Sequence, residues 1–389
     1  MMFANIFGGK VTRAASPAEG NTAFALDLYS RLKATPGNLF FSPYSISSCL
    51  AMTSAGARGD TEKQMNAVLH LGEGQKVHEG FRELQAQLLE AGKRQGIQLN
   101  IANSLWLQKS YDSRRAFLDL AQSNYGAKLT HADFVGHAEQ ARNEVNHWVA
   151  QETRDKIQNI LGPGSVGPAT RLVLANAIYF KGIWEKPFEK SSTGPQPFKL
   201  GGGNERQVPL MHHRDTVRYV EDADFQAVEL PYSGGELATV VLLPKEVEGC
   251  GALENRLTPS FISQSLSQMK RRTVDLFIPR FKLESEFDLV STLTKLGMLD
   301  AFGSGADFSG IDGSKQLFIS GVFHKAWGEV NEEGTEAAAA TAVAVAASAV
   351  MRPPPPPPVF RADHPFLFFI RDTRSGSILF LGRLSEPTA

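Results

Sequence analysis

The chain has 389 residues, of which 42% are hydrophobic and 21% charged, and these ordinary values exclude wholesale disorder. Its 40 basic and 41 acidic residues give a net charge of −1, which argues against a nucleic-acid or membrane-surface protein because neither polyanion would attract it. The two cysteines, Cys49 and Cys250, exclude a disulfide framework. The two cysteines could form a single disulfide bond or remain two free thiols, and free thiols are the favoured alternative.

Targeting signals in the sequence are weak. Residues 1–10 have no charged region before their apolar residues, and the apolar residues are too few to form the hydrophobic region of a secretory signal peptide. No stretch reaches the roughly 18 apolar residues that a membrane-spanning helix needs. A cytoplasmic protein is therefore the default expectation, with an extracellular location left open.

The first predicted elements are an extension and two helices. Residues 1–15 are expected to form a loose N-terminal extension. Either Asn21 or Thr22 is expected to cap a first amphipathic helix, because apolar residues recur after it at four-residue spacing. A second helix is predicted to start with Ser42 as its N-cap and Pro43 in the first helical position.

The remaining elements alternate irregularly between strands and helices. Residues 97–107 carry apolar side chains at period two, with Asn103 as a polar exception, and a helical stripe covers 141–149. Residues 172–180 are apolar on both faces except at Asn176, which predicts a strand inside a sheet. Without the strand–helix–strand rhythm of a doubly wound sheet, the pattern favours an α+β fold in one domain, residues 16–389. Further strands are predicted at 238–243, 274–281, 317–325, 365–370 and 378–384.

The segment from Asn331 to Val359 is unusual. Residues 337–350 contain only Ala, Val, Thr and Ser, whereas surface loops are usually polar and rich in Gly and Pro. Within residues 335–347, every Thr and Val falls on the same face of an extended chain. This stretch therefore resembles a strand without a partner. An alanine-rich helix is the alternative interpretation.

Several motifs then resemble inhibitory serpins, the serine-protease inhibitors that insert a loop into a sheet. Residues 332–341 are similar to the hinge of that family, 38–47 to its shutter, and 176–188 to the strand end and turn beside its breach. The resemblance covers about residues 18–386 and is nearest to the intracellular ovalbumin-like branch and to bacterial serpins. Further matches, in the same order as in the family, are at 230–232, 324–326 and 362–368.

The resemblance implies an α+β serpin fold with three β-sheets, about nine helices and an exposed reactive loop at about residues 332–359. It implies a metastable suicide inhibitor rather than an enzyme, with a serine protease as its covalently bound partner. It also implies a monomer that polymerises when destabilised; no cofactor, metal, nucleic acid or membrane partner is expected. The implied hinge residues are Glu332, Gly334, Thr335, Ala337, Ala339 and Thr341. The implied shutter and breach residues are Ser42, Pro43, Ser45, Asn176, Trp184 and His324, with His324 expected near Trp184 in the breach.

The bond attacked by the protease is predicted between Ser348 and Ala349, by counting the family's usual distance from the hinge. Val350, Met351 and Arg352 are alternatives, although Arg352 precedes Pro353, whose ring nitrogen makes a poor cleavage site. Small apolar residues here favour an elastase-like or subtilisin-like target. A trypsin-like or cysteine protease is the alternative.

The six prolines, 353–358, depart from the family pattern. A stiff polyproline spacer is the favoured interpretation, and docking to a proline-recognising adaptor is a second one. A serpin fold without inhibition, acting as a carrier, storage or chaperone-type protein, is the other functional alternative. The small residues of the hinge argue against it, because bulky or charged residues would obstruct insertion.

Overall fold

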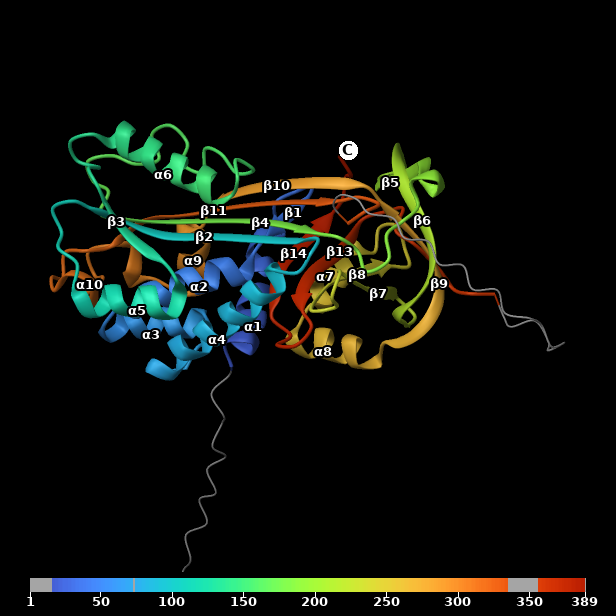
Figure 1. Ribbon diagram of the computed structural model, residues 1–389, viewed down its shortest axis with the longest axis horizontal. Helices are drawn as coiled ribbons and strands as arrows, with labels where there is room; N and C mark the ends of the chain where they lie inside the picture. The colour runs from blue at the N-terminus through green and yellow to red at the C-terminus, as the bar shows by residue number, and fades with distance from the viewer. Residues whose placement is uncertain (1–15, 73, 335–355, 389) are drawn as a thin grey trace, which may run out of the picture.

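The computed structural model describes residues 16–72, 74–334 and 356–388 (Figure 1). These residues form ten α-helices, close to the number that the resemblance implies, and fourteen strands. The helices are α1 (Pro17–Leu32), α2 (Pro43–Ser54), α3 (Gly59–Val68), α4 (Gln75–Gly92), α5 (Arg115–Tyr125), α6 (Ala138–Glu152), α7 (Cys250–Arg256), α8 (Pro259–Gln268), α9 (Val290–Leu296) and α10 (Ser309–Asp312), with short 3-10 helices η1 (Lys190–Ser192) and η2 (Asp300–Phe302). The strands are β1 (Leu39–Phe41), β2 (Ile97–Gln108), β3 (Lys128–Ala132), β4 (Leu172–Gly182), β5 (Gly194–Gly201), β6 (Asn204–Glu221), β7 (Phe225–Pro231), β8 (Leu237–Pro244), β9 (Lys270–Pro279), β10 (Phe281–Asp288), β11 (Ile319–Val330), β12 (Val359–Arg361), β13 (Phe366–Asp372) and β14 (Ile378–Leu384).

The described strands form two hydrogen-bonded networks. A five-stranded sheet has the order β10-β11-β4-β2-β3, and a nine-stranded network has the order β1-β14-β13-β8-β7-β6-β9-β12, with β5 beside β6. The long strand β6 joins the two parts of the larger network, because only its last residues, 218–221, pair with β7. Dividing the network at this junction gives the three sheets that the resemblance implies.

The five-stranded sheet has a parallel pair at its centre. Strands β11 and β4 run parallel, whereas β10 pairs antiparallel with β11 and β2 pairs antiparallel with β4. Helix α6 covers one face of this sheet, while α2, α3 and α5 lie on the other side (Figure 1). Strand β4 is therefore buried on both faces, as its apolar sequence predicts.

Most predicted elements are confirmed, and some boundaries differ. The strand at 378–384 has the predicted bounds, and Ser42 caps α2 by accepting a hydrogen bond from the Ser45 amide. The first helix begins earlier than predicted: Ser16 is its N-cap and Pro17 its first residue. Asn21 and Thr22 lie inside that helix, because the capping box between Ser16 and Glu19 satisfies the terminal amides before them.

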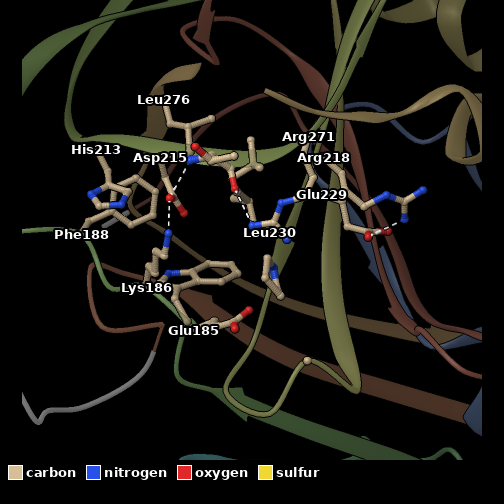
Figure 2. A pocket seen from close by; sticks show the side chains of 15 residues that line it. Glu185, Lys186, Phe188, His213, Asp215, Arg218, Glu229, Leu230, Arg271 and Leu276 are labelled. Atoms are coloured by element: carbon tan, nitrogen blue, oxygen red, sulfur yellow. Dashed lines mark hydrogen bonds and ion pairs between the residues drawn. The ribbon is translucent and has the colours of Figure 1, made fainter. Parts of the chain in front are cut away.

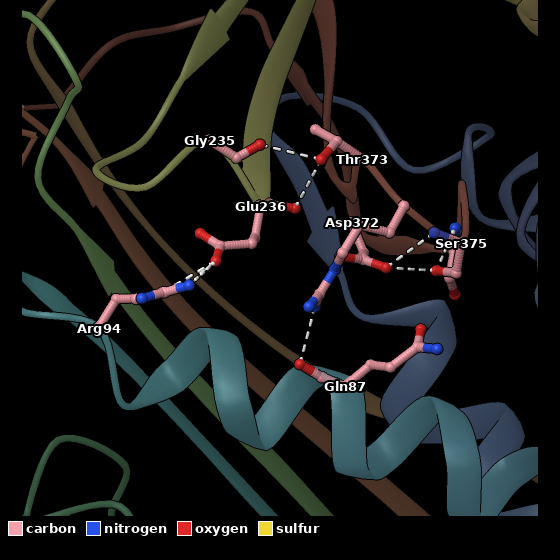
Figure 3. Close-up of polar contacts among 9 residues, drawn as sticks. Gln87, Arg94, Gly235, Glu236, Asp372, Thr373 and Ser375 are labelled. Carbon is pink, nitrogen blue, oxygen red and sulfur yellow. Dashed lines mark hydrogen bonds and ion pairs between the residues drawn. The ribbon is translucent and has the colours of Figure 1, made fainter.

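Polar contacts tie α4, through the Gln87 carbonyl, and Arg94 just after it to the turns of two hairpins (Figure 3). The Arg94 guanidinium donates to the Glu236 carboxylate at 2.8 Å, and Thr373 Oγ1 donates to the carbonyl of Gly235 at 2.9 Å. The carboxylate of Asp372 is fully buried and accepts from the amide and hydroxyl of Ser375. These contacts fix the hairpin of β13 and β14, which lies between β1 and β8.

Both cysteines are free and buried, so the favoured alternative of two thiols is confirmed. Burial raises the pKa of both the Cys49 and the Cys250 thiol to about 12, which keeps them protonated and unreactive at neutral pH. Among the helices of the described residues, none combines the length and apolar character that a bilayer crossing needs.

Candidate functional site

Strand β11 ends in a tight turn, residues 331–334, here called the hinge turn. The Gly334 amide donates to the Asn331 carbonyl at 3.1 Å, and the two residues form an isolated β-bridge. Gly334 has a φ of +81°, and a Cβ at this position would come within 2.2 Å of the Gly182 carbonyl oxygen. Only glycine fits this backbone. The turn therefore brings the chain back over the end of β4.

Two glutamates of the hinge turn bind neighbouring segments. The Glu332 side chain is 3% exposed and forms an ion pair with Arg280, which lies between β9 and β10. Glu333 pairs with the exposed Lys190 at 2.5 Å. Burial alone would raise the pKa of Glu332, but hydrogen bonds, first from Arg280, hold that pKa below its ordinary value. Glu332 is therefore a carboxylate at neutral pH.

The segment after β4 holds the hinge turn through its backbone. The Phe188 amide donates to the Glu332 carbonyl at 2.7 Å, and the Trp184 amide donates to the Glu333 carbonyl at 3.1 Å. The Trp184 indole donates to the Asn331 carbonyl at 2.9 Å and stacks on Tyr232 with ring centroids 4.6 Å apart. Trp184 and Tyr232, here called the breach pair, thus lie directly beside the turn.

A second polar group, here called the shutter cluster, lies within the core near the middle of the five-stranded sheet. The Asn176 amide donates to Ser45 Oγ at 2.6 Å and to Asn103 Oδ1, and Ser45 Oγ donates to Asn103 Oδ1 at 3.0 Å. The Ser42 hydroxyl donates to the Leu379 carbonyl at 2.6 Å. The cluster therefore joins α2, β2, β4 and β14. Its members are Ser42, Ser45, Asn103, Asn176 and His324.

His324 connects the two parallel strands. It is fully buried in β11 opposite Asn176 of β4, and its Nε2 accepts from the Ser42 amide at 3.0 Å. Burial lowers the pKa of His324 to about 3, so the ring is neutral. Because Nε2 accepts, Nδ1 carries the proton and donates to Asn176 Oδ1. Opening the boundary between β11 and β4 at this level must break that bond.

The comparisons with known proteins agree with this geometry. The model of the serpin family, described as serine protease inhibitor, matches residues 19–387. The chain belongs to the serpin family.

Two curated relatives and one solved structure illustrate the similarity. The chain is 43% identical over 380 residues to the leukocyte elastase inhibitor of Bos taurus, covering 94% of this chain and 98% of the relative. It is 42% identical over 381 residues to the leukocyte elastase inhibitor of Homo sapiens, covering 95% and 99%. The crystal structure of uncleaved ovalbumin superposes with a TM-score of 0.87 at 31% identity, covering 96% of this serpin and all of that chain.

One sequence-based expectation about the serpin's site needs correction. His324 was expected near Trp184, but the register of β11 and β4 places it opposite Asn176, in the shutter cluster. Trp184 follows the end of β4 and stacks on Tyr232 instead. Sequence spacing could not reveal this, because it does not fix the register between two distant strands.

The structure also adds residues that the sequence analysis did not assign. Asn103 belongs to the shutter cluster, and its position as a polar exception in an apolar face was a usable signal. Tyr232 stacks on Trp184 and lies in one of the matched motifs. Nothing in the sequence marked Arg280 and Lys190 as partners of the hinge turn, because charged residues are common on any protein surface. Pro43, the remaining predicted shutter residue, is buried as the first residue of α2.

Residues 335–355, which make up most of the predicted reactive loop, lie outside the described residues. This applies to the hinge positions Thr335, Ala337, Ala339 and Thr341 and to the reactive-bond positions Ser348, Ala349, Val350, Met351 and Arg352. The chain is described again from Pro356. The Asp275 amide donates to the Pro358 carbonyl at 3.0 Å, and β12 pairs parallel with β9. The loop therefore connects the end of β11 with the far edge of the nine-stranded network.

Proposed function

We propose that this serpin is a suicide-substrate inhibitor of serine proteases. The observation that carries the proposal is the position of the hinge turn, which leaves β11 directly beside the parallel partner β4. A segment that continues from the turn back along β11 would run antiparallel to both strands. Loop insertion of this kind is the established behaviour of inhibitory serpins. In this proposal the protease cleaves the loop, remains attached as an acyl-enzyme, and is carried along as the loop inserts.

The energetics of the two strands support insertion. Parallel pairing is slightly less stable per residue than antiparallel pairing, so an antiparallel strand between β11 and β4 would improve the hydrogen bonding on both sides. Each inserted residue gains about 1 kcal/mol net, so about fifteen residues gain on the order of 10 kcal/mol. The uncharged residues 337–350 can enter without burying a charge.

An elastase-like or subtilisin-like protease is the proposed target. Relatives about 42% identical are named leukocyte elastase inhibitors, and the predicted reactive bond Ser348–Ala349 suits a shallow apolar pocket. Arg352 keeps a trypsin-like target as the second candidate, and a cysteine protease stays an alternative. Membership of the ovalbumin-like branch or of the bacterial serpins and a monomeric state also remain proposals; ovalbumin is one structural neighbour among several serpins.

The decisive experiment is incubation with a panel of proteases, followed by denaturing electrophoresis and mass spectrometry of the released peptide. We expect a detergent-resistant complex with elastase and a new terminus within residues 347–353. Cleavage without a complex, together with an unchanged melting temperature after cleavage, would instead indicate a non-inserting carrier or chaperone-type serpin. Complex formation only with trypsin and a terminus after Arg352 would select the second candidate.

A matched pair of variants tests the insertion step. Thr335 is the first residue of the face expected to be buried, and Glu336 lies on the other face. Thr335→Arg should leave protease recognition intact but slow insertion, because an unpaired charge would have to leave water. That variant should be cleaved as a substrate with little complex, whereas Glu336→Arg should still trap the protease. Equal trapping by both variants would contradict the assigned face.

A further inference from the structure

A cavity of about 270 Å³ lies between strands β6, β7 and β9 and the segment that follows β4 (Figure 2). Trp184, Phe188, Leu230 and Leu276 give it an apolar lining. Its volume is well above the roughly 150 Å³ of an engineered apolar cavity that takes up benzene. The remaining lining is mostly polar or charged, and a concave site that combines apolar side chains with polar groups is typical of small-molecule sites. The cavity therefore has room for an aromatic ring with a short side chain.

One side of the cavity carries surplus positive charge. The carboxylate of Glu229 binds two arginines, Arg218 at 2.7 Å and Arg371 at 2.8 Å. Arg271 also lines the cavity, and within the described part of the chain no carboxylate lies within ion-pair distance of it. Its guanidinium makes only a long 3.4 Å hydrogen bond, to the carbonyl of Thr216. An exposed cation beside an apolar hollow suits an organic anion.

The opposite side, where Figure 2 shows His213 and Phe188, offers a neutral polar atom. Nε2 of His213 is inaccessible to solvent and has no hydrogen-bond partner. Burial lowers the pKa of His213, so its ring is neutral at pH 7. The charges nearby do not compete for an anion, because Lys186 and Asp215 pair with each other at 2.5 Å. Glu185, the remaining carboxylate, is exposed at the rim.

We propose that this cavity binds a small aromatic carboxylate. Arg271 holds the carboxylate, and the ring packs against Trp184, Phe188 and Leu276. A hydroxyl at the far end of the ring hydrogen-bonds Nε2 of His213 once the imidazole turns toward the cavity, because this atom has no partner and is closed to solvent in the structure. The site is separate from the reactive loop, so its existence does not depend on protease inhibition.

The test is calorimetric titration of the full chain with three probes. These are 3-phenylpropionate, its uncharged amide 3-phenylpropionamide, and 3-(4-hydroxyphenyl)propionate. We expect saturable binding of both acids at about one site per chain, with tighter binding of the hydroxylated acid. The amide should bind about tenfold more weakly or worse, because it lacks the charge-assisted bonds to Arg271.

Matched variants locate the site. Arg271→Gln should weaken both acids about tenfold or more and leave the amide unchanged, whereas Arg272→Gln, the next residue of β9 and not part of the lining, should change neither. Saturating acid should raise the melting temperature of the parent and of Arg272→Gln, but not that of Arg271→Gln. His213→Leu should abolish the preference for the hydroxylated acid.

Three results would overturn the proposal. The first is an absence of saturable acid binding at millimolar concentrations. The second is equal affinity of the acids for the parent and Arg271→Gln, and the third is equal weakening by Arg271→Gln and Arg272→Gln. A hydroxyl preference that survives in His213→Leu would overturn the role of His213.

Discussion

The shutter cluster and the hinge turn both restrain β11, but they do so by different physics. The shutter cluster is buried and uses neutral hydrogen bonds around His324. The hinge turn is held by hydrogen bonds to its backbone and, in addition, by ion pairs whose cations, Arg280 and Lys190, are 39% and 72% exposed. Salt screens exposed pairs but not buried hydrogen bonds. The stability contributed at the centre of the sheet should therefore depend on the buried hydrogen bonds and on pH. The stability contributed at the end of the sheet should depend on ionic strength.

The largest expected effect comes from His324→Leu in the shutter cluster. This change leaves the Ser42 amide and Asn176 Oδ1 buried without a partner, at roughly 2–5 kcal/mol in total. We expect a marked fall in the melting temperature of the native form, of similar size in 0.1 M and 1 M NaCl. His147→Leu, at an exposed position of α6, is the control. An unchanged melting temperature for His324→Leu would show that the cluster does not restrain the sheet.

Acidification should act through the same residue. The native state keeps His324 neutral down to a pKa of about 3, whereas an unfolded histidine binds a proton near its ordinary value of 6.5. Between these values the unfolded state holds more protons, so stability falls as the pH falls below 6.5, by up to about 1.4 kcal/mol per pH unit. Urea unfolding at pH 7.5 and 5.5 should show a larger loss for the parent than for His324→Leu. Identical losses would argue that His324 is not neutral in the fold.

At the hinge turn, Glu332→Gln should cost about 1 kcal/mol, because the partly exposed Arg280 loses a charged partner. The pKa of Glu332 lies below its ordinary value of 4.5, so its contribution is present above pH 4.5 and is lost as the pH falls through the folded pKa. We expect the melting-temperature difference between parent and variant to shrink in 1 M NaCl. If the melting-temperature difference did not depend on salt, the contribution of Glu332 would be that of a buried group, as in the shutter cluster, and not that of a screened ion pair.

The smallest effect is expected for Glu333→Gln. Its partner Lys190 is largely exposed, and exposed ion pairs contribute about 0–1 kcal/mol. The melting temperature should therefore move less than for Glu332→Gln, measured side by side. A larger shift for Glu333→Gln than for Glu332→Gln would contradict the ranking of the two ion pairs by burial.

Local signals in the sequence predicted the parts of the site that depend on neighbouring residues. Ser42 before Pro43 predicted a helix cap, and the same serine proved to donate to the Leu379 carbonyl as well. Asn103 and Asn176 interrupt apolar strands, and the two are hydrogen-bonded to each other, with Asn176 buried and Asn103 half-buried. A polar residue in an apolar strand is thus a usable sign of a buried polar cluster.

Features that depend on long-range register could not be predicted in this way. The placement of His324 follows from its pairing with Asn176, 148 residues away. The 18-residue strand β6 was not predicted, because charged and apolar side chains alternate irregularly along it. Arg280 meets Glu332 only because the β9–β10 junction and the hinge turn fold to the same end of the sheet.

The position of the hairpin of β13 and β14 has a consequence for the cleaved molecule. This hairpin lies between β1 and β8, and β12 pairs with β9, so residues 356–388 are held within the larger network on several sides. A cut anywhere between residues 335 and 355 would therefore give two chains that stay together without a covalent bond. Gel filtration would show one species of unchanged mass, and only a denaturant would release the shorter chain.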